Sequence, residues 1–198
     1  MKDKLQQQLD FIIEIDRIKS IVRKSKIFHK NRYENDAEHC WHISVMAMVL
    51  AEYANEKMDM LKVLKMLLIH DVVKIQTPDK ILYKKTKKDF EEEKAAAKKV
   101  MAMLPPPQEE EFFGLWMEFK EKNTPESRFA GAVDGLQPLM QNTIRDGKEW
   151  RAYNITYEEV IERNRKISEG SKILWDYIKK EIDHADQYDF SDDMMITE

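Results

Sequence analysis

Hydrophobic residues along this chain recur mostly every three or four positions, the spacing that places them on one face of an α-helix. Near the amino terminus, Leu5, Leu9, Ile12 and Ile18 repeat in this way with polar residues between them. The same spacing returns downstream, interrupted by short polar segments. It predicts helices over residues 5–22, 36–55, 60–74, 87–103, 108–122, 125–140, from 157 onward, and over 168–183.

Short polar side chains mark where several of these helices begin. A side-chain oxygen just before a helix accepts a hydrogen bond from an otherwise unpaired amide, so Ser, Thr, Asp and Asn are favoured there. The expected caps are Asn35 or Asp36, Asp59, Thr124 ahead of Pro125, and Thr156 with Glu159 as a capping box. The basic segment from Arg23 to Arg32 is expected to form a loop.

The composition agrees with a helical chain. Of 198 residues only 5 are glycine and 6 proline, too few turn-forming residues for an all-β protein of this length. We therefore predict an all-α fold. The length suits one domain, which we place at residues 1–185, and the acidic segment 186–198 is expected to be a disordered tail.

Charge and cysteine content limit the partners and the compartment. The net charge is −4, which argues against a nucleic-acid polymer as partner because such proteins usually present a basic face. The single cysteine, Cys40, excludes an internal disulfide and is typical of a reducing compartment. There is no apolar run of membrane-spanning length and no apolar core of a signal peptide near the amino terminus. We expect a cytoplasmic protein with no membrane partner.

The candidate chemistry lies in two segments, Glu34–His42 and Leu67–Asp71, which together hold three of the five histidines and the adjacent pair His70-Asp71. Imidazole and carboxylate groups together suit a divalent ion of the zinc, manganese, iron or cobalt group. Adjacent helical residues point about 100° apart, so His70 and Asp71 reach one ion only if it sits at the helix end. A structural or surface role for an isolated His-Asp pair is the competing interpretation.

Three motifs in order decide between these interpretations. They are Glu-Asn-Asp-Ala-Glu-His-x-Trp-His at 34–42, Leu-Leu-Ile-His-Asp at 67–71, and Ala-Val-Asp-x-Leu-Gln-Pro-Leu at 132–139. Together they resemble the HD-domain metal-dependent phosphohydrolases, and the branch they are most similar to is that of the 5′-deoxynucleotidases. The resemblance spans about residues 9–178. It implies a single HD-domain helical bundle, a homodimer, and one divalent metal ion, Mn, Co, Zn, Fe or Ni.

The resemblance also implies roles for individual residues. His42 matches the family pattern as a packing residue rather than a ligand. Arg23 matches the family's contact to the substrate phosphate, and Asp79 matches a second active-site carboxylate. The metal ligands implied are His39, His70, Asp71 and Asp134.

One position departs from the family pattern, which usually continues His-Asp-x-x-Glu with a glutamate that orients or activates water. Here Lys74 stands at that position, and a cationic lysine cannot accept a proton. Asp79 then acts as the base, or Lys74 holds a phosphate oxygen while the metal acidifies water, or the site binds without turnover. Lys24, beside Arg23, stands where some family members have an aromatic residue that helps select deoxyribose, so the sugar preference stays open.

These observations leave three hypotheses about function. The first is a metal-dependent phosphomonoesterase that releases phosphate from (deoxy)nucleoside 5′-monophosphates, weakened by Lys74. The second is a degenerate HD-domain protein that binds metal and nucleotide without turnover. The third is a purely structural metal site, which would require a closed ligand shell.

Overall fold

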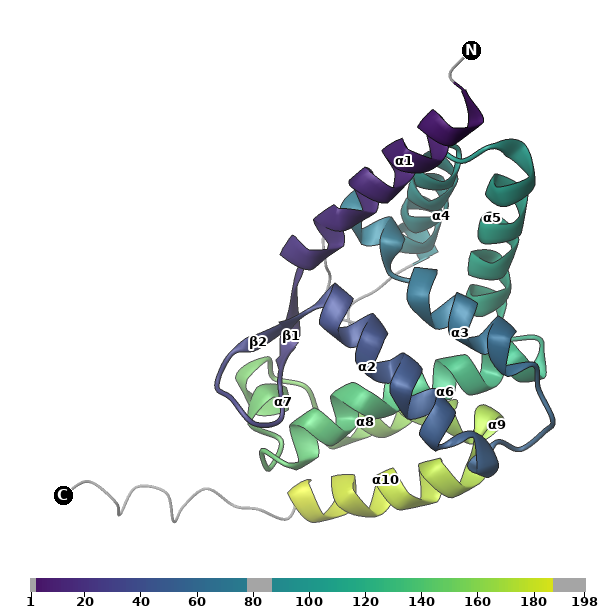
Figure 1. Ribbon diagram of the computed structural model, residues 1–198. Helices are drawn as coiled ribbons and strands as arrows, with labels where there is room; N and C mark the ends of the chain where they lie inside the picture. The colour runs from purple at the N-terminus through teal and green to yellow at the C-terminus, as the bar shows by residue number, and fades with distance from the viewer. Residues whose placement is uncertain (1–2, 78–86, 187–198) are drawn as a thin grey trace.

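Helix α6 (Pro125–Thr143) runs through the middle of the molecule and packs against α2, α3, α5, α9 and α10 (Figure 1). The computed structural model describes residues 3–77 and 87–186. The other elements in chain order are α1 (Lys4–Ile15), η1 (Asp16–Ser20), β1 (Val22–Lys26), β2 (Tyr33–Asn35), α2 (Asp36–Val49), η2 (Ala51–Tyr53), α3 (Met60–Ile69), η3 (Val72–Ile75), α4 (Lys87–Met101), α5 (Pro106–Glu121), α7 (Lys148–Ala152), α8 (Tyr157–Asn164), α9 (Ile167–Gly170) and α10 (Lys172–Asp186).

The central position of α6 follows from its start signal and its apolar face. Thr124 and Ser127 exchange hydrogen bonds between side chain and backbone, and Pro125 occupies the first helical position, so the expected cap is confirmed. The helix then buries Phe129, Val133, Leu136 and Leu139. These side chains form the main core with residues from α2, α3, α5 and α10. The prediction of an all-α fold is therefore confirmed.

The basic segment after the first helix differs from the expectation. The first helix ends at Ile15 and continues as a 3₁₀ turn to Ser20, and residues 22–26 then pair antiparallel with residues 33–35. The expected loop over 23–32 is thus wrong for its first four residues. Burial alternates along β1, but the residues on its inner side are the polar Arg23 and Ser25, and the buried residue of β2 is Glu34. Hydrophobic alternation, the usual signal of a half-buried strand, is therefore missing from the sequence. The hairpin matters because it carries Arg23.

The carboxyl-terminal helix is also divided differently from the prediction. Instead of one helix over 168–183, a short α9 ends at Gly170 and α10 begins at Lys172. The Ser171 hydroxyl between them donates to the Tyr53 carbonyl and accepts from the Leu174 amide. At Gly170, a Cβ atom would lie 2.3 Å from the Arg128 carbonyl oxygen, so α9 approaches α6 as closely as only glycine permits.

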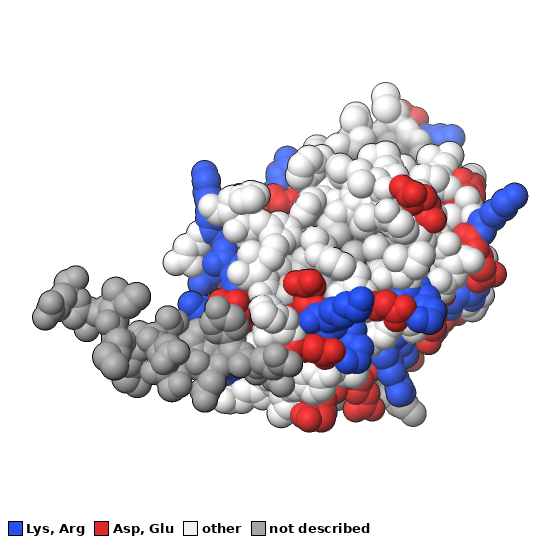
Figure 2. Space-filling view, turned by 90° about the horizontal axis from the view of Figure 1, so that it is seen from below, with Lys and Arg blue, Asp and Glu red and all other residues white. Residues whose placement is uncertain are grey.

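Figure 2 shows the molecule from the side on which α10 lies, with positive and negative side chains interspersed in one band. Two ion pairs on α10 account for part of this mixture, Lys172 with Asp176 and Lys179 with Asp183. This face therefore presents no continuous basic strip. Within the described ranges, no helix is both long and apolar enough to span a membrane. Of the segment 186–198 that we expected to form a tail, Asp186 is the last residue of α10, and residues 187–198 lie outside the described part of the chain.

Candidate metal centre

His39 lies one turn into α2, at the buried side of the helix. A capping box fixes the start of α2, with the Asn35 side chain accepting from the Glu38 amide and Glu38 accepting from the Asn35 amide. The His39 side chain is fully buried. Its Nδ1 lies 2.7 Å from Gln137 Oε1, and its Nε2 lies 3.0 Å from Asp134 Oδ1.

His70 and Asp71 stand at the end of α3, as the sequence required for a shared ion. The helix ends at Ile69, with His70 as its C-cap. The His70 ring is held from two sides, because Nδ1 lies 2.8 Å from the Leu67 carbonyl oxygen and the ring packs against Phe119 at 4.8 Å. The indole of Trp116 donates to the His70 carbonyl. These contacts leave Nε2 facing the carboxylates.

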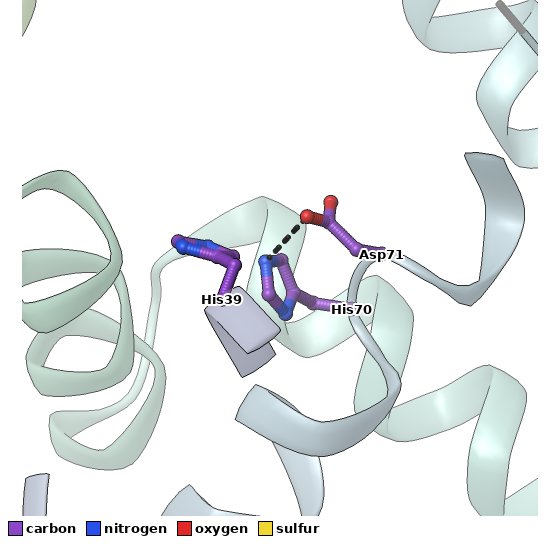
Figure 3. Close-up of side chains that lie close together, drawn as sticks. All are labelled: His39, His70 and Asp71. Carbon is purple, nitrogen blue, oxygen red and sulfur yellow. Dashed lines mark ion pairs between the residues drawn. The ribbon is translucent and has the colours of Figure 1, made fainter. Parts of the chain in front are cut away.

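The side chains of His39, His70 and Asp71 converge. One potential ligand atom from each lies within 4.8 Å of the other two, and Figure 3 shows the two rings and the carboxylate facing a common space. Asp134 joins from α6, since its Oδ1 lies 3.0 Å from His39 Nε2 and 3.5 Å from His70 Nε2. The structure thus places all four residues expected to bind metal near one another. His39, His70 and Asp71 form the group whose ligand atoms all lie within 4.8 Å, and Asp134 lies outside this group, beside the two histidines.

The donor atoms fit a divalent transition ion. The Leu67 carbonyl can only accept, so His70 Nδ1 carries a hydrogen, and Nε2 offers its lone pair when the ring is neutral, as metal binding requires. His70 Nε2 lies 3.3 Å from Asp71 Oδ2. Imidazole nitrogens and carboxylate oxygens aimed at one point are the donor set that zinc, manganese, iron, cobalt or nickel takes. The residues present therefore suit one such ion.

The exposure of these side chains shows where the centre is accessible. The side chains of His39, His70 and Asp71 are 0%, 4% and 10% exposed, whereas that of Asp134 is 31% exposed. The centre is therefore reached from solvent beside Asp134. A centre with an accessible side suits exchange of water and substrate better than a closed structural shell.

Two cations, Arg23 and Lys74, lie beside Asp71. Arg23 Nη1 lies 2.8 Å from Asp36 Oδ1 and 2.9 Å from Asp71 Oδ2. Lys74 Nζ makes the same two contacts, each at 2.9 Å. The four groups therefore form an alternating arrangement of two cations and two carboxylates. Asp36 is fully buried, and its pairing with Lys74 could not be read from the sequence.

Electrostatics keep negative charge at this centre. Burial by itself raises the pKa of Asp71 and of Asp134, but both pKa values are held well below the ordinary range. His70, Lys74 and Arg23 lower the pKa of Asp71, and His70 and His39 lower that of Asp134. Burial by itself lowers the pKa of His70, yet the carboxylates of Asp71 and Asp134 raise it well above its usual value. The cluster therefore stabilises positive charge between its members, which is what a cation site requires.

Lys122 is a buried amine that sequence reasoning missed. It caps α5 with a left-handed backbone (φ 55°), and its Nζ lies 3.2 Å from the centre of the Phe119 ring, without a hydrogen-bond partner among the described residues. Gly131 leaves room for it, since a Cβ there would lie 2.5 Å from that Nζ. Burial, with Lys120 and Lys166 nearby, lowers the pKa of Lys122 to about 7 despite the opposing effect of Asp134.

The remaining candidate residues have different placements. Arg23 is on β1 at the centre, whereas Lys24, the next residue, is exposed and points to the other face of the strand. His42 contacts the Gln137 amide at 2.9 Å and does not belong to the group of three potential ligands. Asp79 lies outside the described residues.

Two buried polar residues behind the centre, Glu34 and Gln137, also went unassigned in the sequence although both lie within the family motifs. Their position in a motif was the signal available. It could not give their role, because the partners that define it come from other parts of the chain.

This fold and ligand set belong to a known class of helical protein. A family model described as the HD domain matches residues 15–175, and the chain belongs to the HD-domain family. Among solved structures, a predicted metal-dependent phosphohydrolase from Magnetospirillum magnetotacticum MS-1 is 40% identical with a TM-score of 0.87, covering 92% of each chain. A search of curated proteins finds no match.

Two archaeal structures share the fold at lower identity. The PH0347 protein from Pyrococcus horikoshii OT3 is 21% identical with a TM-score of 0.60, covering 87% of this chain and 99% of its own. A conserved hypothetical protein from Pyrococcus furiosus is 21% identical with a TM-score of 0.61, covering 89% and 99%. At this identity the two support the fold alone, and the expectation of an HD-domain bundle is confirmed.

Proposed function

We propose that this protein is a divalent-metal-dependent phosphohydrolase that releases phosphate from (deoxy)nucleoside 5′-monophosphates. The observation that carries the proposal is the convergence of His39, His70, Asp71 and Asp134 beside an accessible edge. The similar Magnetospirillum structure, described as a predicted metal-dependent phosphohydrolase, supports the reaction class. The nucleotide substrate rests on the resemblance of the three motifs to 5′-deoxynucleotidases.

Each ligand residue contributes a fixed donor atom. His39 and His70 present Nε2, and Asp71 and Asp134 present carboxylate oxygens. When bound, a divalent ion (Mn, Co, Zn, Fe or Ni) supplies Lewis-acid polarisation of a phosphoryl oxygen and acidifies water. Because the ligand side chains are held by buried contacts, little reorganisation is needed when substrate arrives.

Arg23 and Lys74 would bind the phosphate. Both lie against Asp71 and are largely buried, with 14% and 11% of their side chains exposed. Arg23 Nη1 and Nε already face carboxylates, so its guanidinium and the Lys74 ammonium would attract the phosphate chiefly through their charge. Lys74 cannot accept a proton from water while it is cationic, so the transfer of that proton is assigned to Asp79, which lies outside the described residues.

The proposal is tested with a phosphatase screen of the purified full chain. Nucleoside and deoxynucleoside 5′-monophosphates and small phosphate esters are incubated with Mn²⁺, Co²⁺, Ni²⁺, Zn²⁺ or Fe²⁺, and released phosphate is measured. We expect release that requires the metal and is lost in His70→Ala. The matched control is His29→Ala, the same change at an exposed histidine. Absence of metal-dependent release at high enzyme concentration would refute the proposal.

A second candidate function follows from Lys74. Loss of a positioned general base typically lowers the rate by about 10²–10⁴-fold, so a protein that binds metal and nucleotide without turnover is the alternative. Nucleotide then raises the melting temperature, because a ligand that binds only the folded state stabilises it, and no phosphate is released. The same screen, followed by thermal unfolding with each nucleotide, separates the two functions.

The partners, the oligomeric state and the cellular location of the protein are also proposals. The interspersed charges around α10 agree with a small-molecule substrate rather than a nucleic-acid polymer. A homodimer is proposed from the family resemblance, and a cytoplasmic location from the single cysteine. Light scattering of the purified chain tests the homodimer directly.

A further inference from the structure

The amide of Gln137 lies between His39 and the carboxylate of Glu34. Gln137 Oε1 is 2.7 Å from His39 Nδ1, and Gln137 Nε2 is 2.6 Å from Glu34 Oε1. All three side chains are buried, with 0%, 0% and 2% of the residue exposed for Gln137, His39 and Glu34. Buried polar groups must satisfy one another, so the orientation of each group restricts the next.

Glu34 determines which way the Gln137 amide points. The Glu34 carboxylate also faces Arg23, with Oε2 3.3 Å from Nε, and a carboxylate paired with a guanidinium can only accept hydrogen bonds. The amide must therefore turn its NH₂ group to Glu34. Its second N–H then reaches His42 Nδ1 at 2.9 Å. The amide oxygen is left facing His39.

The amide oxygen in turn determines which nitrogen of His39 carries hydrogen. Both acceptors near His39 Nδ1 lack hydrogens to donate, Gln137 Oε1 at 2.7 Å and Glu34 Oε2 at 3.6 Å. Nδ1 must therefore carry a hydrogen. Nε2 lies 3.0 Å from the Asp134 carboxylate, so it is the nitrogen left for a metal ion that binds beside Asp134. A neutral histidine has one donor and one acceptor nitrogen, and the partner of one nitrogen decides which is left for a metal.

We propose that Glu34 and Gln137 are positioning residues that fix the ring tautomer of His39, so that Nε2 is presented to the metal ion. The inference rests on the metal binding of the proposed function but not on the substrate. It assigns an effect on metal affinity to Glu34, which reaches the ligand through the Gln137 amide. The Glu34 carboxylate also pairs with Arg23. It therefore connects the candidate metal ligand His39 with the residue proposed to bind the phosphate.

The key variant is Glu34→Gln, which has nearly the same shape but can present either a donor or an acceptor to Gln137. The ring hydrogen is located by ¹⁵N NMR in an Asp134→Ala background, which removes the competing carboxylate acceptor at Nε2. At a pH where the ring is neutral, we expect the metal-free Glu34→Gln protein to show both His39 tautomers, whereas the protein with Glu34 shows only Nδ1–H. Metal affinity is measured with Asp134 in place. Co²⁺ affinity measured by calorimetry should fall about tenfold, the lower end of the range for losing a group that orients a ligand.

A paired substitution keeps the inference testable if single changes disturb folding. In Glu34→Gln/Gln137→Glu the carboxylate moves next to His39, and the amide at position 34 can donate to it. One tautomer and at least wild-type Co²⁺ affinity should return, since a carboxylate partner raises the basicity of a ligating histidine. Failure of the pair to restore the tautomer would overturn the inference.

The control is Gln141→Met. Gln141 Nε2 lies 3.2 Å from Glu34 Oε1, and its own oxygen is buried without a hydrogen-bond partner within the described part of the chain. This change perturbs the same carboxylate but not His39, so the tautomer and the Co²⁺ affinity should stay as in the wild type. A wild-type tautomer in folded Glu34→Gln would refute the inference. A wild-type protein that binds no Co²⁺ would instead refute the proposed metal site, and the NMR comparison would still decide the tautomer question.

Discussion

Restoring the family glutamate with Lys74→Glu tests how far the charges at the centre depend on one another. The Lys74 ammonium lies 2.9 Å from both Asp36 Oδ1 and Asp71 Oδ2. The side chains of Asp36 and Asp71 are 0% and 10% exposed, so water screens these contacts poorly. The substitution replaces an attraction with a third carboxylate beside Arg23.

The expected magnitude follows from the burial of these groups. Removing one partner of a buried ion pair costs about 3–5 kcal/mol, because it leaves the other charge uncompensated. Repulsion between the new carboxylate and Asp36 adds to this loss. We therefore expect Lys74→Glu to lower the free energy of unfolding of the metal-free protein by about 3–5 kcal/mol. Addition of Mn²⁺ should reduce the loss, since the ion replaces the missing positive charge next to Asp71.

The assay is a double-mutant cycle by urea unfolding with Asp36→Asn, Lys74→Glu and the double variant. Neutralising Asp36 removes one of the repelling carboxylates, so the double variant should be more stable than the sum of the single effects predicts by about 1–3 kcal/mol. The control is Lys24→Glu, the same change at an exposed neighbour of Arg23, expected to stay within about 0.5 kcal/mol of wild type. Additive single effects would refute the coupling of these charges.

The four proteins of the cycle, which are wild type, the two single variants and the double variant, also test how catalysis depends on position 74. A gain in phosphatase rate confined to the Asp36→Asn/Lys74→Glu background would mean that the glutamate acts as a base once its charge is accommodated. No gain in either background would mean that another group already manages the proton.

The other predictions concern a buried amine, a close helix contact and the metal. Lys122 has a folded pKa of about 7 against 10.5 when unperturbed, so between these values the unfolded chain binds more protons and stability rises with pH. Lys122→Met should therefore be more stable than wild type at pH 6, with an advantage that shrinks by about 1.4 kcal/mol per pH unit above pH 7; an advantage constant from pH 6 to 10 in urea unfolding would contradict this. Gly170→Ala should lose several degrees of melting temperature because its Cβ would meet the Arg128 carbonyl at 2.3 Å, whereas Gly114→Ala, with open space around its Cβ, should not; equal melting temperatures would show that α9 moves freely from α6. Removal of metal with EDTA should lower the melting temperature of wild type but not of His70→Ala, since binding to the folded state alone stabilises it, and an equal drop in both would place the stabilising ion elsewhere.

Local hydrogen bonds and apolar spacing made much of the helical fold readable from the sequence. The caps at Asn35, Asp59, Thr124 and Thr156 are confirmed, because each depends on a side chain and an amide two or three residues away. The position of His70 was not predicted in this way, because the helix expected over 60–74 ends at Ile69 and only the structure places His70 at a helix end. The hairpin could not be predicted, since its inward-facing residues, such as Arg23 and Glu34, are charged and give no hydrophobic alternation.

The sequence by itself determined the helical class, and the resemblance of its motifs indicated four candidate ligands for one metal ion. Only the tertiary structure decided what surrounds them: Lys74 and Asp36 pair across 38 residues, and Glu34 contacts Gln137 across 103. The physical reason is that the partner of a buried charge is chosen by packing. Residues remote in the chain share one water-poor space, and there each unpaired donor or acceptor costs free energy.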